Sequence, residues 1–341
     1  MRRRSRLNAV LTGAALAALT ACGSDPAATP DSPVAVANQD ESAVDRSQAE
    51  IAPPAEIAPQ VDAARGDRLS AATYRNSLSV CWTDARCKRG MAVAHGGSWS
   101  VLGAPYDSNA ALAAAYAQGA DGVKIDVRVT KDNVPVIAHS SPIKLYESID
   151  CANKKIEDMT AAEVSKCHRV PSSTETFQRL DDVLEYLRGK MVAELTVKRS
   201  SDYARTIAEV LARRAEDFAY LEISTAELRD QIPKISGSDR VYYLINVEDR
   251  LTEIDELVDT IKNPRAFMVE IDPGVRLGSV ISARLHPAGV RAFIYDSNGL
   301  LSAAQVKAYF DQGFDVVSSN QVKNTVKGRQ QVNTARGVTP P

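Results

Sequence analysis

Two histidines stand at the ends of apolar segments, where a side chain is held firmly enough to do chemistry. His95 ends the segment Met91–His95, and His139 ends a longer segment in which polar and apolar residues alternate. Imidazole ionises near neutral pH, so one histidine of a pair can remove a proton while the other donates one. His95 and His139 are therefore the predicted acid–base pair, whereas His168 and His286 are expected to take no part.

Charged residues alternate with apolar ones in two segments near these histidines. Every second side chain of a strand lies on the same face. Carboxylates on such a face could hold a divalent cation, and cations on it could hold an anion. The residues that share a face are Lys124, Asp126 and Arg128 in the first segment, and Glu194, Thr196 and Lys198 in the second.

The elements that would position these residues are short β-rich segments alternating with helical patterns. The predicted strands are Met91–His95, Gly122–Val129, Met191–Val197, Phe218–Ile223, Arg240–Asn246, Ala266–Ile271, Val290–Tyr295 and Asp315–Ser318. The predicted helices are Asn109–Gln118, Leu180–Leu187, Asp202–Arg214, Thr225–Gln231, Arg250–Ile261 and Ser302–Gln312.

Eight strands with intervening helices predict an α/β fold of the (β/α)8 TIM-barrel type. Such barrels take about 250 residues and carry their reactive groups at the carboxyl ends of the strands. An open doubly wound sheet is the alternative, but the sequence lacks the glycine-rich phosphate loop typical of that fold. The barrel brings the ends of the first three predicted strands together, and with them the histidines, the carboxylates and the cations.

With these residues in order, the segment from Val93 to Lys198 resembles the glycerophosphodiester phosphodiesterase family, and the similarity extends over most of residues 91–322. The family's first strand ends in His-Arg-Gly, its second carries Glu-Leu-Asp, a Thr-Lys-Asp-Gly turn and His-Asp, and its third carries Glu-Ile-Lys. The resemblance implies that His95 and His139 are the acid–base pair and that Asp126 and Glu194 are two of three metal ligands. The further matches are Thr130-Lys131-Asp132, Asn109, Gly119-Ala120-Asp121-Gly122, Leu180-Asp181-Asp182-Val183-Leu184 and Gly313-Phe314-Asp315-Val316-Val317.

The departures from the family pattern fall at the site itself. The most consequential is Lys124, which stands where the family has its first metal-binding glutamate. Divalent cations such as Mg²⁺ or Ca²⁺ need oxygen ligands, so a lysine there is expected to weaken or abolish metal binding. The other departures are Gly96 for the arginine after the first histidine, Ser108 for the glutamate before Asn109, Ser140 for the aspartate after the second histidine, Thr196 for the lysine of Glu-Ile-Lys, and Asn320 for a late aspartate.

Lys124 leaves two hypotheses open. In the first, its ammonium replaces the charge of the metal, as an arginine does in bacterial phosphatidylinositol-specific phospholipases C, and the protein is a phosphodiester hydrolase or lyase. Its substrate would be a glycerophosphodiester, a lysophospholipid or a related phosphodiester. In the second, Lys124 neutralises Asp126 and Glu194 in an inactive pocket, and the protein serves binding or envelope structure. The predicted substrate-binding residues are Arg128, Lys198, Asn109 and Trp99.

The N-terminus predicts export and anchoring to a membrane by lipid. Residues 1–22 combine four arginines, an apolar stretch too short to span a bilayer, and the sequence Leu19-Thr20-Ala21-Cys22, which resembles the lipobox of bacterial lipoproteins. Cys22 is thus the predicted lipidation site. Residues 23–75 are rich in alanine and proline, which predicts a disordered tether. The barrel is expected over 76–330 and a C-terminal tail over 331–341.

The net charge and the cysteine content argue against two kinds of partner, nucleic acid and zinc. The net charge of −2 becomes −6 once residues 1–21 and their four arginines are removed, which argues against nucleic-acid binding. The protein is expected to be a monomer. The four remaining cysteines are too irregularly spaced for a zinc site, so an exported protein is expected to pair them locally, as Cys81–Cys87 and Cys151–Cys167.

Overall fold

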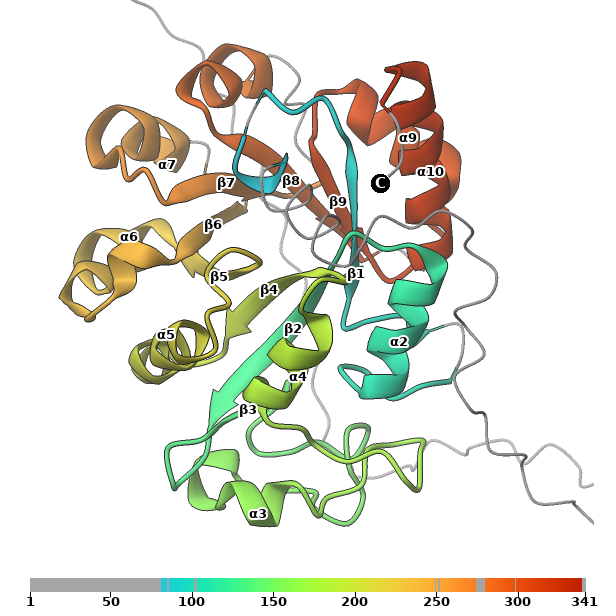
Figure 1. Cartoon of the computed structure of the whole chain (residues 1–341), viewed down its shortest axis with the longest axis vertical. Helices are drawn as coiled ribbons and strands as arrows, with labels where there is room; N and C mark the ends of the chain where they lie inside the picture. Colours follow the sequence, from blue (N-terminus) through green and yellow to red (C-terminus); the bar gives the residue numbers. More distant parts are fainter. Residues whose placement is uncertain are drawn as a thin grey trace, which may run out of the picture. The chain divides into compact units, whose positions relative to one another are not determined.

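The computed structural model describes residues 81–338, apart from 85, 101–102, 249, 251, 274–279 and 298. The predicted signal segment, Cys22 and the tether lie outside the described residues. Eight parallel strands form a barrel surrounded by helices (Figure 1). These strands are β1 (Met91–His95), β2 (Gly122–Val129), β4 (Val192–Val197), β5 (Ala219–Ser224), β6 (Tyr242–Glu248), β7 (Ala266–Ile271), β8 (Arg291–Asp296) and β9 (Val316–Ser319).

The barrel is closed because β1 pairs with both β9 and β2. The predicted (β/α)8 barrel is thereby confirmed, and the open-sheet alternative is wrong. A ninth strand, β3 (Pro135–Ile137), was not expected from the sequence. It pairs antiparallel with the end of β2, beyond the point at which β1 stops, with Val127 opposite Ile137. This pairing returns the chain to the carboxyl edge of the barrel just before His139.

The lower part of the barrel interior is apolar, as alternation along the strands requires. A turn before β1 closes this end, where Trp82 packs on Tyr220 with ring centroids 5.1 Å apart. The Cys81–Cys87 disulfide holds the turn and confirms the predicted pairing. The interior residues of this layer are Met91, Val93, Val192, Tyr220, Leu244, Met268, Phe293 and Val316. The reactive groups are therefore confined to the upper part of the barrel.

The surrounding helices begin and end at capping residues that can be recognised in the sequence. Ser108 caps the first long helix by accepting a hydrogen bond from the amide of Ala111, and Gly119 ends it with a φ of 91°. The α-helices are α2 (Asn109–Gln118), α3 (Ala161–Val164), α4 (Leu180–Leu187), α5 (Tyr203–Ala212), α6 (Thr225–Asp230), α7 (Thr252–Asp255), α9 (Ala303–Asp311) and α10 (Val322–Ala335). Short 3-10 turns lie at 156–158, 200–202, 232–234, 238–240 and 286–288, and π-helical turns at 256–261 and 281–285.

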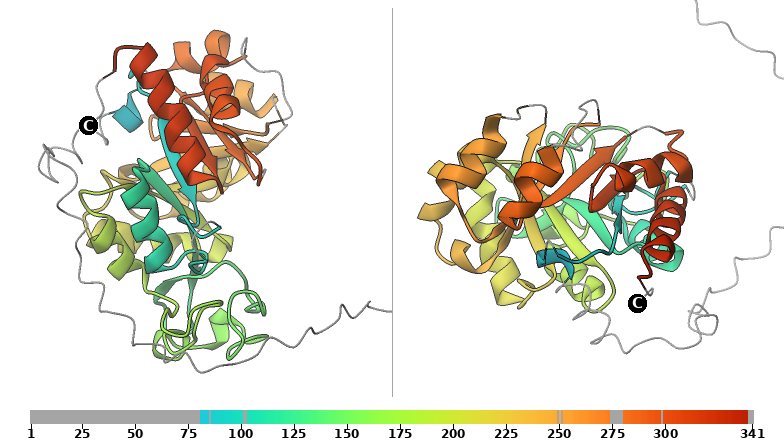
Figure 2. Two further views of the ribbon diagram at one scale, coloured as in Figure 1. Left: turned by 90° about the vertical axis from the view of Figure 1, so that its right-hand side faces the viewer. Right: turned by 90° about the horizontal axis from the view of Figure 1, so that it is seen from above.

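The last helix corrects a predicted boundary. α10 runs to Ala335 and lies beside α9 (Figure 2), so the first part of the predicted tail at 331–341 belongs to the barrel. Its Arg329 forms a buried ion pair with Asp121, and its Asn333 donates a hydrogen bond to the carbonyl of Gly90. The sequence of α10 is polar, which hid it from a search for apolar periodicity.

A long excursion, residues 138–179, connects β3 to α4 and has an apolar core of its own. The Cys151–Cys167 disulfide crosses it, which confirms the second predicted pairing. Ile143, Ile156 and Phe177 are among the residues buried in this core. The barrel and the excursion thus contain the apolar cores and both disulfides found in the described residues. No helix in the described part of the chain is long and apolar enough to cross a membrane.

Candidate active site

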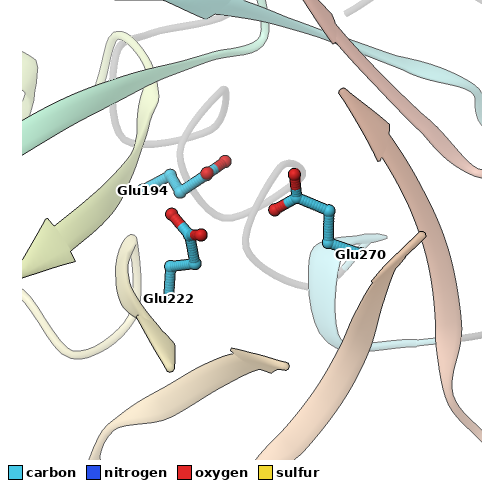
Figure 3. A group of neighbouring side chains, drawn as sticks. All are labelled: Glu194, Glu222 and Glu270. Atoms are coloured by element: carbon cyan, nitrogen blue, oxygen red, sulfur yellow. The ribbon is translucent and has the colours of Figure 1, made fainter. Parts of the chain in front are cut away.

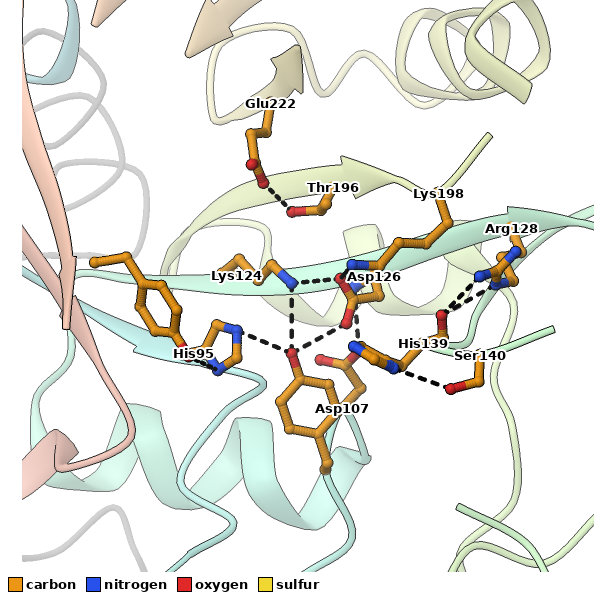
Figure 4. Close-up of polar contacts among 12 residues, drawn as sticks. His95, Asp107, Lys124, Asp126, Arg128, His139, Ser140, Thr196, Lys198 and Glu222 are labelled. Carbon is orange, nitrogen blue, oxygen red and sulfur yellow. Dashed lines mark hydrogen bonds and ion pairs between the residues drawn. The ribbon is translucent and has the colours of Figure 1, made fainter. Parts of the chain in front are cut away.

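The residues that were predicted to take part in the reaction lie together at the carboxyl edge of the barrel (Figure 4). His95 is the last residue of β1, and its register partner on β2 is Lys124. Lys124 in turn lies opposite Glu194 on β4, and Asp126 lies opposite Thr196. The sequence prediction that these strand ends form one site is therefore correct.

Asp126 is the electrostatic centre of the site. Its carboxylate is completely buried and forms ion pairs with Lys124 and, at 2.7 Å, with Lys198. Burial alone would raise the pKa of Asp126, but the two ammonium groups outweigh it and hold that pKa below its usual range. Burial opposes the charge on Lys124 in the same way, yet Asp126 and nearby carboxylates raise the pKa of Lys124. Two ammonium groups thus share the single carboxylate of Asp126.

His95 is held in place on several sides. Its Nδ1 lies 2.9 Å from Oδ1 of Asn320, and its ring stacks on Tyr295 with centroids 4.4 Å apart. The indole of Trp99 donates a hydrogen bond to its carbonyl oxygen. Burial, together with the charge of Lys124, lowers the pKa of His95 to about 3, so the imidazole is neutral at physiological pH.

Tyr106, on the loop between β1 and α2, fills the space between the two histidines. Its ring centroid lies 5.3 Å from that of His95 and 5.9 Å from that of His139. Its hydroxyl donates to Asp126 (3.0 Å), accepts from Lys124 (3.4 Å) and lies 3.3 Å from Nε2 of His95. The tyrosine therefore connects one histidine to the charged cluster.

His139 is positioned through its backbone. Arg128 donates two hydrogen bonds to its carbonyl oxygen, and the buried carboxylate of Glu147 accepts one from its amide. Its Nδ1 lies 3.1 Å from the hydroxyl of Ser140. Burial lowers the pKa of His139, although the ring is only half buried. Arg128, predicted to bind substrate, is thus placed where it positions His139.

A cleft of about 620 Å³ opens above these residues. It is lined by His95, Trp99, Ser100, Gly103, Ala104, Tyr106, His139, Tyr146, Val170 and Pro171. Trp99 was predicted to bind substrate and does line the cleft. Asn109, with the same prediction, does not: it is exposed at the start of α2. Asp107 points inward instead, with a φ of 58° and a carboxylate that accepts from the amide of Asp126.

The residues at the family's metal position do not fit a divalent cation. Lys124 replaces a ligand there, and both cationic side chains contact the carboxylate of Asp126, which an ion would need. The pairing of Asp126 and Glu194 as metal ligands stays a prediction, and the contacts of Asp126 with two ammonium groups argue against its part in it. Within the described residues, Glu194 groups with Glu222 and Glu270, whose carboxylate oxygens lie within 4.8 Å of one another (Figure 3).

This group of three glutamates comes from β4, β5 and β7, and its Glu194 is the register partner of Lys124. Tyr220 donates to Glu194 at 3.0 Å, and Glu222 accepts from Thr196 and from the amide of Asn246. Burial, reinforced by the charge of Glu222, raises the pKa of Glu194 to about 8, and burial also raises that of Glu270. Three carboxylates are the donor set that a hard divalent cation prefers, so Glu194, Glu222 and Glu270 are the residues that would hold one.

Several residues of the site were not predicted from the sequence. Glu222 and Glu270 lie inside strands, and an acidic residue within an apolar strand was the signal that could have found them. Asp107 lies one position before the serine that was aligned with the family's glutamate. Since no local pattern marks it, only the fold shows that its carboxylate reaches the site.

The chain is a closed (β/α)8 barrel with two histidines and several ionisable residues at its carboxyl edge. The model of the glycerophosphoryl diester phosphodiesterase family matches residues 103–218. The match covers about a third of the chain, and solved structures of such enzymes share its barrel. The match suggests glycerophosphodiester phosphodiesterase activity.

Three solved structures illustrate the similarity. The glycerophosphodiester phosphodiesterase of Agrobacterium tumefaciens is 19% identical with a TM-score of 0.57, over 69% of this chain and 98% of its own. The enzyme from Parabacteroides distasonis is 19% identical with a TM-score of 0.61, over 77% and 92%. The Oleispira antarctica phosphodiesterase, solved with the product sn-glycerol-3-phosphate, is 20% identical with a TM-score of 0.55, over 74% and 99%. No curated protein sequence matches the chain.

Proposed function

We propose that the protein is a phosphodiesterase in which Lys124 and Lys198 supply the positive charge that a metal supplies elsewhere. One observation carries this proposal: Asp126 is held between two ammonium groups directly below a cleft lined by two histidines. The excess positive charge favours a phosphodiester anion in the cleft. The substrate class is a glycerophosphodiester, a lysophospholipid or a related phosphodiester, in line with the family and with the product bound to the Oleispira protein.

In the proposed reaction the two histidines transfer protons. One imidazole removes the proton of a substrate hydroxyl, whose oxygen attacks phosphorus, and the other donates a proton to the leaving oxygen. The product is then a cyclic phosphate and an alcohol; water opens the ring in a hydrolase, whereas a lyase releases it. His95 is neutral before substrate binds, so it is in the form that accepts a proton. The negative charge of a bound phosphodiester raises the proton affinity of both imidazoles.

A second candidate function rests on Tyr106. Its hydroxyl already contacts Lys124, the cation that a phosphate would need, and donates a hydrogen bond to Asp126. If the ring stays in this position, the pocket is catalytically inactive and the protein binds a ligand without turning it over. Catalysis requires the ring to move aside or its hydroxyl to become one of the contacts to phosphate.

Turnover of a panel of phosphodiesters, with and without chelator, separates these functions. The panel includes glycerophosphocholine, glycerophosphoethanolamine and lysophosphatidylcholine, each of which carries a hydroxyl that can attack phosphorus. We expect chelator-resistant turnover by the wild type and a loss of at least about a hundredfold in His95→Ala, His139→Ala and Lys124→Glu. Equal rates for wild type and the double-histidine variant on every substrate would favour the binding function. Loss of activity with chelator alone would reject the role of the lysines.

We also propose that the protein is exported and anchored through an acyl group on Cys22, as the sequence of residues 1–22 supports. Cells that express the chain are labelled with radioactive palmitate and fractionated. We expect label on the wild type in the membrane fraction and none on Cys22→Ser. A labelled Cys22→Ser variant would disprove this site of lipidation.

A further inference from the structure

Three large apolar side chains lie exposed together at one place on the surface. Leu145, Tyr146 and Ile149 are 66%, 65% and 72% exposed, although side chains of this kind are normally buried. They belong to one short loop of the excursion, residues 144–149, which we call the apolar loop. The other large apolar residue exposed among those described, Leu300, is on a different loop, between β8 and α9. Exposed apolar groups clustered in this way mark an interaction site.

The apolar loop is held in place from below. Ile143, just before it, is fully buried and exchanges backbone hydrogen bonds with Asn153 and Lys154. Within the loop, Glu147 turns its carboxylate inward, to the backbone amides of His139 and Ser140. These buried contacts of Ile143 and Glu147 hold the loop in place, so its apolar side chains are exposed because of the fold.

The loop is continuous with the cleft. Tyr146 lines the cleft, and its hydroxyl lies 3.1 Å from that of Ser140, the neighbour of His139. Ile149 lines a second cavity of about 620 Å³, which shares Val170 and Pro171 with the cleft. An apolar path therefore leads from the two histidines to the exposed loop.

The charges around the loop favour an anionic partner. Lys144, Lys154 and Lys155 are exposed, and the backbone pairing of Ile143 with Lys154 brings the two ends of this lysine group together. The acidic side chains of the same stretch are occupied, since Glu147 is buried and Asp150 pairs with His168. Exposed apolar side chains with several lysines beside them are the combination that binds the surface of an anionic bilayer.

We propose that the apolar loop docks on an anionic lipid surface, with Leu145 and Ile149 inserted among the lipids and the neighbouring lysines on the head groups. This inference rests on the proposed function: docking would serve a phosphodiesterase by placing its cleft over phosphodiester head groups in the membrane. It narrows the substrate class to phosphodiesters presented by a lipid surface. The docking itself involves neither histidine and can be measured whether or not the protein is an enzyme.

Flotation with vesicles tests the docking. The chain from residue 76 onward, which contains the closed barrel and both disulfides, is mixed with vesicles of phosphatidylcholine containing 30 mol% phosphatidylglycerol. We expect the wild type to float with the vesicles, and Leu145→Ser/Ile149→Ser to bind at least about tenfold more weakly. Lys144→Glu/Lys155→Glu should lose the preference for phosphatidylglycerol over pure phosphatidylcholine. The matched control, Leu300→Ser, removes an equally exposed leucine elsewhere and should bind like the wild type.

Other results would overturn the proposal. Wild type that stays unbound would disprove docking, and an equal loss in Leu300→Ser would disprove the assignment to this loop. Light scattering without vesicles tests the other occupant, a second copy of the chain: a dimer that Leu145→Ser/Ile149→Ser dissociates would make the loop a protein interface. An unchanged melting temperature shows that the double variant is folded. Unchanged turnover of glycerophosphocholine, a water-soluble substrate, separates docking from catalysis, and His95→Ala should float like the wild type.

Discussion

A Cβ atom on Gly96 would lie 2.0 Å from Cε2 of Tyr106, so the glycine and the tyrosine ring depend on each other. The family has arginine at the position of Gly96, and this chain has neither that side chain nor room for it. The ring of Tyr106 occupies the space and reaches the charged cluster. The departures at Gly96 and Lys124 are therefore parts of one rearranged site.

The first prediction concerns this pair. Gly96→Ala should destabilise the protein by about 1–3 kcal/mol, because the new methyl group overlaps the ring of Tyr106. Gly289→Ala is the matched control, since Gly289 also has a positive φ (77°) but no atom within 4 Å of the added Cβ. Urea unfolding of both variants, alone and combined with Tyr106→Ala, measures the coupling. If Tyr106→Ala relieves the cost of Gly289→Ala as much as that of Gly96→Ala, the two residues are not coupled.

A second prediction follows from the burial of Asp126. Asp126→Asn leaves two ammonium groups without their carboxylate, and breaking a buried ion pair in this way costs about 3–5 kcal/mol. Asp230 supplies the control because its ion pair with Arg229 is exposed on both sides. The change Asp230→Asn should leave the midpoint of urea unfolding nearly unchanged, because an exposed ion pair contributes little to stability. Equal midpoints of urea unfolding for the two variants would contradict the charge balance described for the site.

Much of the fold followed from local patterns. The segment Gly122–Val129 was predicted with its observed bounds, because alternation along a strand and burial on both faces of the barrel leave a strong signature. The histidines and Lys124 were found because they terminate or interrupt such segments. β3 was missed because it has only three residues, and α10 because its sequence is polar.

The part of the site that the sequence did not indicate depends on contacts between segments that are far apart in the chain. Asp126 and Lys198 are 72 positions apart in the chain (198 − 126), and no spacing rule indicates that they form an ion pair. Glu270 meets Glu194 only because the barrel is closed. The exposure of Leu145 and Ile149 also could not be foreseen, since apolar residues in a sequence are normally expected to be buried.

The third prediction concerns the two histidines of the cleft. Burial lowers the pKa of His139, and the Lys198 charge lowers it further, so His139 should titrate below 6.5 and its pKa should rise in Lys198→Met. His95 should remain neutral down to about pH 5, because its pKa is about 3. NMR of the imidazole protons can test both, since the chain has four histidines and single substitutions assign them. An unchanged His139 pKa in Lys198→Met would show that the lysine has no electrostatic effect on it.

The last prediction is a loss of stability at alkaline pH caused by the buried glutamates. The pKa of Glu194 rises from 4.5 to about 8 on folding, so the folded protein holds a proton that the unfolded chain releases. Stability that is complete below about pH 4.5 is therefore lost as pH rises toward 8, by up to about 1.4 kcal/mol per pH unit for each such proton. Glu194→Gln keeps an acceptor for the Tyr220 hydroxyl but cannot ionise, so its midpoint of urea unfolding should fall less between pH 5.5 and 8.5 than that of the wild type. The titration is done with chelator, because an ion on the carboxylates would hold them ionised. If the unfolding midpoints of the wild type and Glu194→Gln fall in parallel as pH rises, Glu194 is already charged in the folded barrel.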